Sequence, residues 1–242
     1  EFTAATLVGS YANGVTVSLG ERTASADVAI EPAAPSELVI TPNSPTLFAQ
    51  QSIQFEAEVS DEFSNVIPDA EVLFSCDNPE AGVCDSDGRF TASKNLGVYS
   101  GAVVATFEDL SVDIDVEIVA GDPARIELMP TEITTALATQ VGFSAVVFDS
   151  SDVEIDDVTV TWSALDDLGE INTEGILNVG RIPGEYDKGV TASIGDVEAF
   201  ATVIVPTDFD DDGIDDNLEL DNSLDPEDPS DALADEDGDG IS

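Results

Sequence analysis

One stretch of the sequence occurs three times, and this repetition restricts the fold more than any other feature. The last copy runs from Gly184 to Val205 and contains a Gly-x-Tyr motif, a short apolar run and a closing strand. Its tyrosine, Tyr186, corresponds to Tyr99 and Tyr11, so that the copies lie about 88 residues apart. A fixed period of this size indicates an array of similar modules. Of the three modules that these copies mark, the last two are complete, and the first is present only as its second half.

Within each copy the residue pattern is that of short β-strands. Apolar residues alternate with polar or acidic ones from Ile53 to Val59, and again from Val112 to Ile118, which is the period of a half-buried strand. Each of these two ranges predicts one continuous strand. Trp162 aligns with Phe74, and we predict that it is a core residue of the central strand. Turn-forming residues separate many short strands of this kind, so we predict an all-β fold made of sandwiches.

Short, proline-containing joints divide the chain into four predicted segments. Residues 1–35 form the C-terminal half of a repeat, 36–120 and 121–206 form two complete repeats, and 207–242 form an acidic segment. Because proline restricts the backbone, we expect the repeats to form a stiff rod. A half-repeat leaves strand edges open. Either the chain is a fragment of a longer array, which we favour, or these strands complete another chain.

The two cysteines, Cys76 and Cys84, are close in sequence and even in number. They align with Ala164 and Ile171 in the next repeat, which are both candidate core positions. We therefore predict a disulfide with a short loop, which implies an oxidising compartment. The alternative is a pair of buried free thiols.

The net charge of the chain argues against some classes of binding partner and favours others. The sequence has 52 acidic and 6 basic residues, for a net charge of −46. Nucleic acid and anionic membranes both require Lys and Arg, so neither is an expected partner. No apolar stretch approaches the roughly 18 residues of a membrane span, which argues against direct membrane insertion. A charge of this size must be compensated by solvent cations or by bound metal.

The segment that follows residue 207 has acidic residues at the intervals of a calcium loop. Calcium takes several oxygen ligands, and carboxylates this close together repel one another without a cation. The predicted ligands of a first loop are the side chains of Asp208, Asp210, Asp212, Asp216 and Glu219 and the backbone carbonyl of Ile214, with Gly213 at the sharp turn. Asp235, Asp237, Asp239 and Ile241 match the first positions of a second loop. The alternative is a disordered acidic tail.

Two resemblances follow from these motifs. The order of proline, short strand, proline, alternating Phe strand, Val-x-Trp-Ser, Gly-x-Tyr and closing strand resembles bacterial immunoglobulin-like repeats of the invasin and intimin type, over residues 1–206. That resemblance implies tandem sandwiches in the stalks of surface adhesins, or spacers in secreted enzymes, and it carries no functional residue. The acidic segment resembles thrombospondin type 3 repeats. Asp215 stands at the eighth loop position, where an EF-hand usually has an apolar residue, and so favours this form over a helix–loop–helix site.

Enzyme chemistry finds little support in the sequence. The chain has no histidine, which excludes Ser-His-Asp and Cys-His sites and histidine-bound zinc. It has no glycine-rich phosphate loop, and any glycosidase-like pair of carboxylates would be a chance selection among so many acids. We expect a non-catalytic, secreted or cell-surface stalk or adhesion segment that is stiffened by calcium. The expected partners are Ca²⁺, neighbouring immunoglobulin-like repeats, and a surface protein or glycan.

Two alternatives to this function remain open. The first is a spacer or carbohydrate-binding accessory region of a secreted polysaccharide-degrading enzyme. The second is a fibre subunit that is assembled by strand donation.

Overall fold

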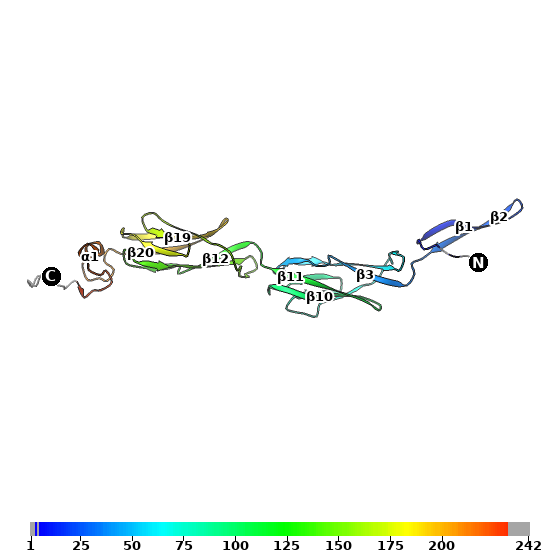
Figure 1. Ribbon diagram of the computed structural model, residues 1–242, viewed down its shortest axis with the longest axis horizontal. Coiled ribbons are helices and arrows are strands. Elements are labelled where there is room, and N and C mark those ends of the chain that lie inside the picture. Colours follow the sequence, from blue (N-terminus) through cyan, green and yellow to red (C-terminus); the bar gives the residue numbers. More distant parts are fainter. Residues whose placement is uncertain (1–2, 4, 232–242) are drawn as a thin grey trace, which may run out of the picture. The chain divides into compact units, whose positions relative to one another are not determined.

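A computed structural model describes residues 3 and 5–231, and almost all of its regular structure is β-strand. The chain divides into two compact units, Glu1–Val119 and Ala120–Ser242, whose strands can be followed in Figure 1. Each unit is described separately below. In the described part of the chain, no helix is both long and apolar enough to cross a membrane.

The first unit begins with a hairpin and continues with a complete repeat. The hairpin strands are β1 (Gly9–Leu19) and β2 (Arg22–Ile30). The repeat consists of β3 (Pro35–Thr41), β4 (Thr46–Phe48), β5 (Ser52–Gln54), β6 (Glu56–Asp61), β7 (Leu73–Ser75), β8 (Gly82–Cys84), β9 (Arg89–Ala92), β10 (Gly97–Phe107) and β11 (Leu110–Val119). One layer is a four-stranded sheet in the order β4-β11-β10-β7, and the other contains the pair β3-β6 and the trio β5-β9-β8. β4 runs parallel to the end of β11.

The second unit has the same arrangement of strands and adds one helix. Its elements are β12 (Pro123–Met129), β13 (Glu132–Thr134), β14 (Gln140–Gly142), β15 (Ser144–Asp149), β16 (Thr161–Ala164), β17 (Gly169–Ile171), β18 (Ile176–Val179), β19 (Gly184–Ile194), β20 (Val197–Val205) and α1 (Asp216–Asn222). The four-stranded layer is β13-β20-β19-β16, and the opposing layer contains β12-β15 and β14-β18-β17. The predicted all-β sandwich fold is therefore confirmed in both complete repeats.

The hairpins β1–β2, β10–β11 and β19–β20 share one register, which confirms the threefold repetition seen in the sequence. In each hairpin the tyrosine pairs with a valine, and a β-bulge follows the tyrosine. The pairs are Tyr11 with Val28, Tyr99 with Val116 and Tyr186 with Val203. The first hairpin is thus the structural equivalent of the last two strands of a complete repeat.

Each of these tyrosines makes the same hydrogen bond. Its hydroxyl donates to the backbone carbonyl four residues upstream, at 2.9, 3.1 and 2.7 Å for Tyr11, Tyr99 and Tyr186. This bond, known as a tyrosine corner in immunoglobulin-like sandwiches, fixes the turn that leads into the hairpin. The Gly-x-Tyr motif marks the repeat in the sequence, whereas this bond becomes visible only in the structure.

The sandwich core is formed by the alternating faces of the strands. On β11, Ile114, Val116 and Ile118 are at most 5% exposed, whereas the acidic residues between them face solvent. This alternation confirms the strand predicted from Val112 to Ile118.

The prediction of one strand from Ile53 to Val59 was wrong. β5 pairs with β9 and β6 pairs with β3, so the chain changes partner between them. Phe55 occupies the change point: its N–H donates to the carbonyl of Gly88 at 2.8 Å, and its buried ring meets Phe90 edge-on. Phe143 has the same position between β14 and β15. A period-2 pattern records only which side chains face the core, and it continues unbroken through such a change.

The prediction for Trp162 was correct in part. Its side chain is half-buried and packs against the core of the second unit. Its strand, β16, lies at the edge of the four-stranded sheet rather than in the centre, because the next strand, β17, belongs to the opposing layer. A Cβ atom at Gly175 would lie 3.0 Å from the indole ring, so that Trp162 covers this glycine closely.

Candidate metal centre

The predicted calcium loop follows β20 directly and folds back on itself. The N–H of Asp216 donates to the carbonyl of Thr207 at 2.9 Å, and the N–H of Phe209 donates to Oδ1 of Asp216 at 2.7 Å. Gly213 has φ +94°, a left-handed conformation that glycine adopts without strain, as predicted for the sixth position of the loop. The two ends of the loop are thereby brought together.

Helix α1 carries the last two predicted ligands into the interior of the loop. Asp215 is its N-cap, and its side chain accepts a hydrogen bond from the N–H of Asn217 at 2.9 Å. This cap accounts for an acidic residue at the eighth position. Asp216 and Glu219 lie on the inner side of the helix and are both 0% exposed.

The aspartates of the loop share one pattern of hydrogen bonding. Each aspartate that was predicted to be a ligand uses one carboxylate oxygen to accept a backbone N–H and leaves the other without a partner among the described residues. Asp208 accepts from Gly213 at 3.1 Å, Asp210 from Asp212 at 3.2 Å and Asp212 from Ile214 at 2.7 Å. The buried oxygens that have no partner in the described part of the chain are Oδ1 of Asp208, Oδ2 of Asp210, Asp212 and Asp216, Oδ1 of Asp231 and both oxygens of Glu219.

These carboxylates gather in two overlapping groups. Within each group the candidate ligand atoms lie within 4.8 Å of one another. One group contains Asp208, Asp210 and Asp212, and the other contains Asp212, Glu219 and Asp231. The structure thus brings four of the five predicted side-chain ligands into these groups and adds Asp231. The fifth, Asp216, is buried and lies one helical turn before Glu219 on α1. The interval rule of a calcium loop ends at Glu219, so only the turn-rich sequence after it could have suggested a further acid.

The electrostatics of the group are those of a site that lacks a counter-charge. Burial, followed by the nearby charges of Asp210, Asp212, Asp216 and Asp231, raises the pKa of Glu219 to about 7. Burial also raises the pKa of Asp210, and Asp212, Asp208 and Asp231 raise it further. Across the described ranges, none of these acids forms an ion pair with Lys or Arg. The seven unpaired oxygens of the described residues are all carboxylate oxygens, the ligand type that Ca²⁺ prefers.

For the remaining predicted ligands, the structure does not define a position of the ligand atom in the site. Ile214 is half-buried beside the carboxylates, and its N–H donates to Asp212, but the role of its carbonyl oxygen as a ligand stays a prediction. Asp235, Asp237, Asp239 and Ile241, which were predicted to begin a second loop, lie outside the described residues.

Helix α1 is attached to the sandwich of the second unit by three contacts. Arg181, in the loop between β18 and β19, forms an ion pair with Asp221 at 2.8 Å. Its backbone carbonyl accepts a hydrogen bond from Asn217 at 3.3 Å. Leu220 packs against the apolar core cluster. Helix α1, and with it the predicted loop, is therefore in direct contact with the sandwich of the second unit.

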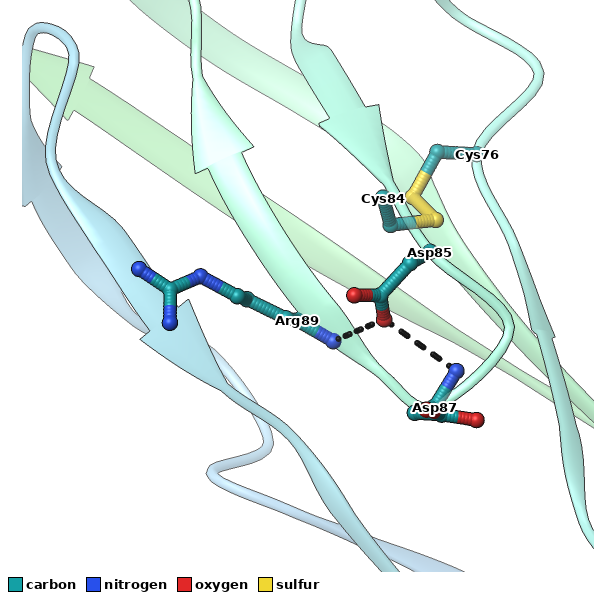
Figure 2. Close-up of a disulfide and its surroundings, with 5 residues drawn as sticks. All are labelled: Cys76, Cys84, Asp85, Asp87 and Arg89. Carbon is teal, nitrogen blue, oxygen red and sulfur yellow. Dashed lines mark hydrogen bonds between the residues drawn. A yellow bond between two sulfur atoms is a disulfide. The ribbon is translucent and has the colours of Figure 1, made fainter.

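The predicted disulfide between Cys76 and Cys84 is confirmed (Figure 2). The two Cα atoms lie 5.7 Å apart. Cys76 directly follows β7, the edge strand of one layer, and Cys84 ends β8, an edge strand of the other, so the bond joins the two layers. Next to it, Asp85 accepts hydrogen bonds from the N–H groups of Asp87 and Arg89 at 3.1 and 2.9 Å (Figure 2).

A second type of buried carboxylate has a purely structural role. Asp61 accepts hydrogen bonds from the N–H groups of Ala33, Phe63 and Asn65 at 2.8 to 2.9 Å. Burial raises its pKa, but the bonds from Asn65, Ala33 and Phe63 outweigh this effect and lower the pKa to about 2. Asp149 accepts the corresponding bonds in the second unit, including one from Gly121 at 2.9 Å. Each aspartate thus fixes the backbone that enters its repeat.

The chain was compared with known proteins. No protein-family description matches it, and no curated protein does. Similar solved structures include domains 1–6 of the surface layer protein SbsC, with 19% identity, a TM-score of 0.34, and coverage of 77% of this chain and 30% of that one. The Escherichia coli adhesin FdeC has 14% identity, a TM-score of 0.49, and coverage of 77% and 71%. The four N-terminal Ig domains of Dscam1 have 12% identity, a TM-score of 0.44, and coverage of 76% and 50%.

At these values of identity and TM-score, the likenesses assign neither a family nor a function to the chain. The assignment of the fold rests on the strand order and register described above. The chain spans less than a third of the SbsC structure.

Proposed function

We propose that this chain is a non-catalytic segment of a secreted or cell-surface protein, made of tandem immunoglobulin-like sandwiches whose acidic C-terminal part is stiffened by Ca²⁺. The observation that carries the calcium part is the set of buried carboxylate oxygens without partners in the loop from Asp208 to Glu219. Buried carboxylates are stable only when they are paired or bound to a cation. A hard divalent cation with oxygen ligands fits this donor set best.

The non-catalytic and extracellular parts of the proposal have separate support. The disulfide between Cys76 and Cys84 is typical of an oxidising compartment. The acids with raised pKa values, Asp210 and Glu219, belong to the candidate cation group and have no histidine beside them. The single tryptophan, Trp162, packs against the core, which weakens a role as a sugar-stacking platform.

Stiffening would follow from the attachment of α1 to the sandwich. Without a cation, repulsion among the carboxylates favours an open loop; with one, the loop and α1 order together, because metal binding is coupled to folding. The contacts of Asp221, Asn217 and Leu220 then pass that order to the second unit. This behaviour agrees with the resemblance of the segment to thrombospondin type 3 repeats.

Limited proteolysis with and without a chelator tests the calcium proposal. Removal of calcium should expose the chain after Thr207 to cleavage, while residues 36–206 stay intact. Asp208→Asn should show the same sensitivity even in calcium. Asp211→Asn is the matched control, because Asp211 lies exposed in the same loop and is absent from both carboxylate groups. Equal cleavage in calcium and in EDTA would contradict an ordered calcium loop.

A second candidate function is assembly through the first hairpin. Val15 is 40% exposed, whereas its equivalents Val103 and Val190 are fully buried by the remaining strands of their repeats. The apolar face of β1–β2 therefore matches a cover formed by strands equivalent to β3–β9. We propose that a neighbouring immunoglobulin-like repeat supplies these strands.

Sedimentation of the chain over a range of concentrations tests whether a second copy is that neighbour. Strand exchange between copies should give a dimer that Val15→Asp abolishes and that Glu21→Gln, in the exposed hairpin turn, leaves unchanged. A monomer at all concentrations would reject assembly between copies of this chain.

A further inference from the structure

The turn that follows α1 brings a carboxylate back to the metal loop. Ser223 ends the helix in a left-handed conformation with φ 64°, and the N–H of Leu224 donates to the carbonyl of Glu219 at 2.9 Å. Two successive turns then follow, in which Asp228 donates to the carbonyl of Asp225 at 2.9 Å and Asp231 donates to that of Asp228 at 3.1 Å. We call residues 225–231 the closing turn.

Asp231 is prepared for a ligand in the same way as the aspartates of the loop. Its Oδ2 accepts the N–H of Asp225 at 2.6 Å, which fixes the side chain, and its Oδ1 is buried without a partner in the described ranges. The candidate ligand atoms of Asp212, Glu219 and Asp231 lie within 4.8 Å of one another. The closing turn thus places the free oxygen of Asp231 near Asp212 and Glu219, although Asp231 lies beyond the end of the loop pattern at Glu219.

Glu219 gives independent evidence for a cation at this point. Its side chain is 0% exposed, and neither of its carboxylate oxygens has a hydrogen-bond partner among the residues that the structure describes. A buried carboxylate without a donor or a counter-ion is strongly unfavourable. The ion pairs of the described chain involve Arg125 and Arg181, and neither pairs with this group.

The number of charges indicates that one divalent ion is not enough. Five carboxylates lie in the two groups, those of Asp208, Asp210, Asp212, Glu219 and Asp231, and the buried Asp216 lies one helical turn before Glu219. A single Ca²⁺ would leave most of their charge uncompensated in a buried region, where repulsion is stronger than in water. Asp212 belongs to both carboxylate groups, and Glu219 has two free oxygens.

We propose that Asp231 is a cation ligand, and that Asp212, Glu219 and Asp231 hold a second Ca²⁺ beside the one assigned to the loop. This inference rests on the proposed calcium function of the loop. The second ion attaches the closing turn to α1, so that residues 225–231 become ordered only when this position is filled. Water and backbone carbonyls complete the coordination, because the free carboxylate oxygens alone do not saturate two ions.

Calcium titration of the full chain by calorimetry, together with hydrogen exchange, tests the inference. Asp231→Asn should bind one calcium fewer than the wild type. It should lose calcium-dependent protection in residues 223–231 and keep that protection in residues 208–219. Glu227→Gln is the matched control, because it removes the same charge from an exposed position of the closing turn. It should behave as the wild type. Slow exchange in β19 and β20 confirms that each variant is folded.

The outcomes separate the two proposals. If Asp208→Asn loses calcium but Asp231→Asn binds as much as the wild type and keeps its protection in residues 223–231, the second position is wrong and the loop site stands. If neither variant changes calcium binding, both proposals fail. If Glu227→Gln loses one calcium as Asp231→Asn does, the effect is one of general charge, and Asp231 is not a ligand.

Discussion

The two complete repeats have the same strands in the same order, but their exposed edges are secured by different means. In the first unit, the disulfide of Cys76 and Cys84 joins the two layers. In the second, the equivalent residues, Ala164 and Ile171, are apolar and pack against the core. The second unit instead has α1 and the carboxylate loop attached to its sandwich. One repeat carries a covalent link between its layers, and the other carries a non-covalent attachment of α1, which under the calcium proposal depends on bound cation.

The comparison shows which features the copies of the repeat share and which they do not. The paired hairpins, the bulge and the tyrosine hydrogen bond are the same in all copies. The edge between the layers, in contrast, can be closed by a disulfide or by apolar contact. The strand register and the core are therefore common to the repeats, whereas the residues at the edge between the two layers differ between them.

Removal of the disulfide should have the largest effect on this comparison. The bridge closes a loop with a sequence separation of 8, for which the loss of loop-closure entropy in the unfolded chain corresponds to about 2.5 kcal/mol. Cys76→Ala with Cys84→Ala should lower the melting temperature of the first unit by on the order of 10 °C. Hydrogen exchange during heating, followed separately in β10 and β19, should detect the change in the first unit alone.

A variant that copies the second unit sharpens the same test. Cys76→Ala with Cys84→Ile reproduces the residues found at 164 and 171 and should recover part of the lost stability through apolar burial. Full recovery would show that the covalent bond contributes nothing that apolar contact cannot supply.

Truncation of Leu220 should have a smaller effect, confined to the second unit. Because this side chain is only partly buried against the core cluster, Leu220→Ala should cost about 1 kcal/mol, less than a fully buried leucine. Trp162, the only tryptophan, reports on this unit by fluorescence during urea unfolding. The exposed Leu218→Ala serves as the control. If the effect of Leu220→Ala is the same in calcium and in EDTA, docking of the helix does not depend on the cation.

The smallest difference between the units is expected in acid. The folded pKa of Asp61, about 2, is lower than the ordinary value near 3.9 for an unfolded chain. The unfolded state therefore binds the proton first, and the stability that Asp61 contributes is complete above about pH 4 and is lost as the pH falls toward 2.

Urea unfolding of each unit at pH 4.5 and at pH 2.5 measures this loss. Asp61→Asn should remove part of the acid sensitivity of the first unit, since this carboxylate holds the entering backbone and its pKa is lowered to about 2. An unchanged pH dependence in Asp61→Asn would show that other carboxylates cause the acid sensitivity.

The sequence predicted the fold well where its residue pattern was periodic. The 88-residue repeat and the alternation on β11 translate directly into register and burial. The change of strand partner at Phe55 could not be predicted, because alternation reports which face a side chain occupies and not which strand lies beside it. The edge position of Trp162 escaped prediction for the same reason. Sheet order depends on contacts between residues that are distant in the chain.

The candidate site could be predicted where it depends on the spacing of residues that are close together in the sequence. The intervals from Asp208 to Glu219 place four of the predicted side chains in the two carboxylate groups, and the glycine turn lies where it was expected. Asp231 escaped prediction because its position depends on how the chain turns after α1, which requires the left-handed Ser223 and the two turns beyond it. The role of Asp215 as a helix cap also became visible only with the helix in place.

The disulfide between the two layers has a mechanical consequence if the chain transmits force along its length. A pulled repeat normally unravels to its full contour, at about 3.5 Å for each residue. The segment between Cys76 and Cys84 cannot extend beyond the 5.7 Å that separates their Cα atoms, so about 20 Å of chain stays hidden until the bond is reduced. Under tension, the redox state of the surroundings would then set how far the first repeat can lengthen.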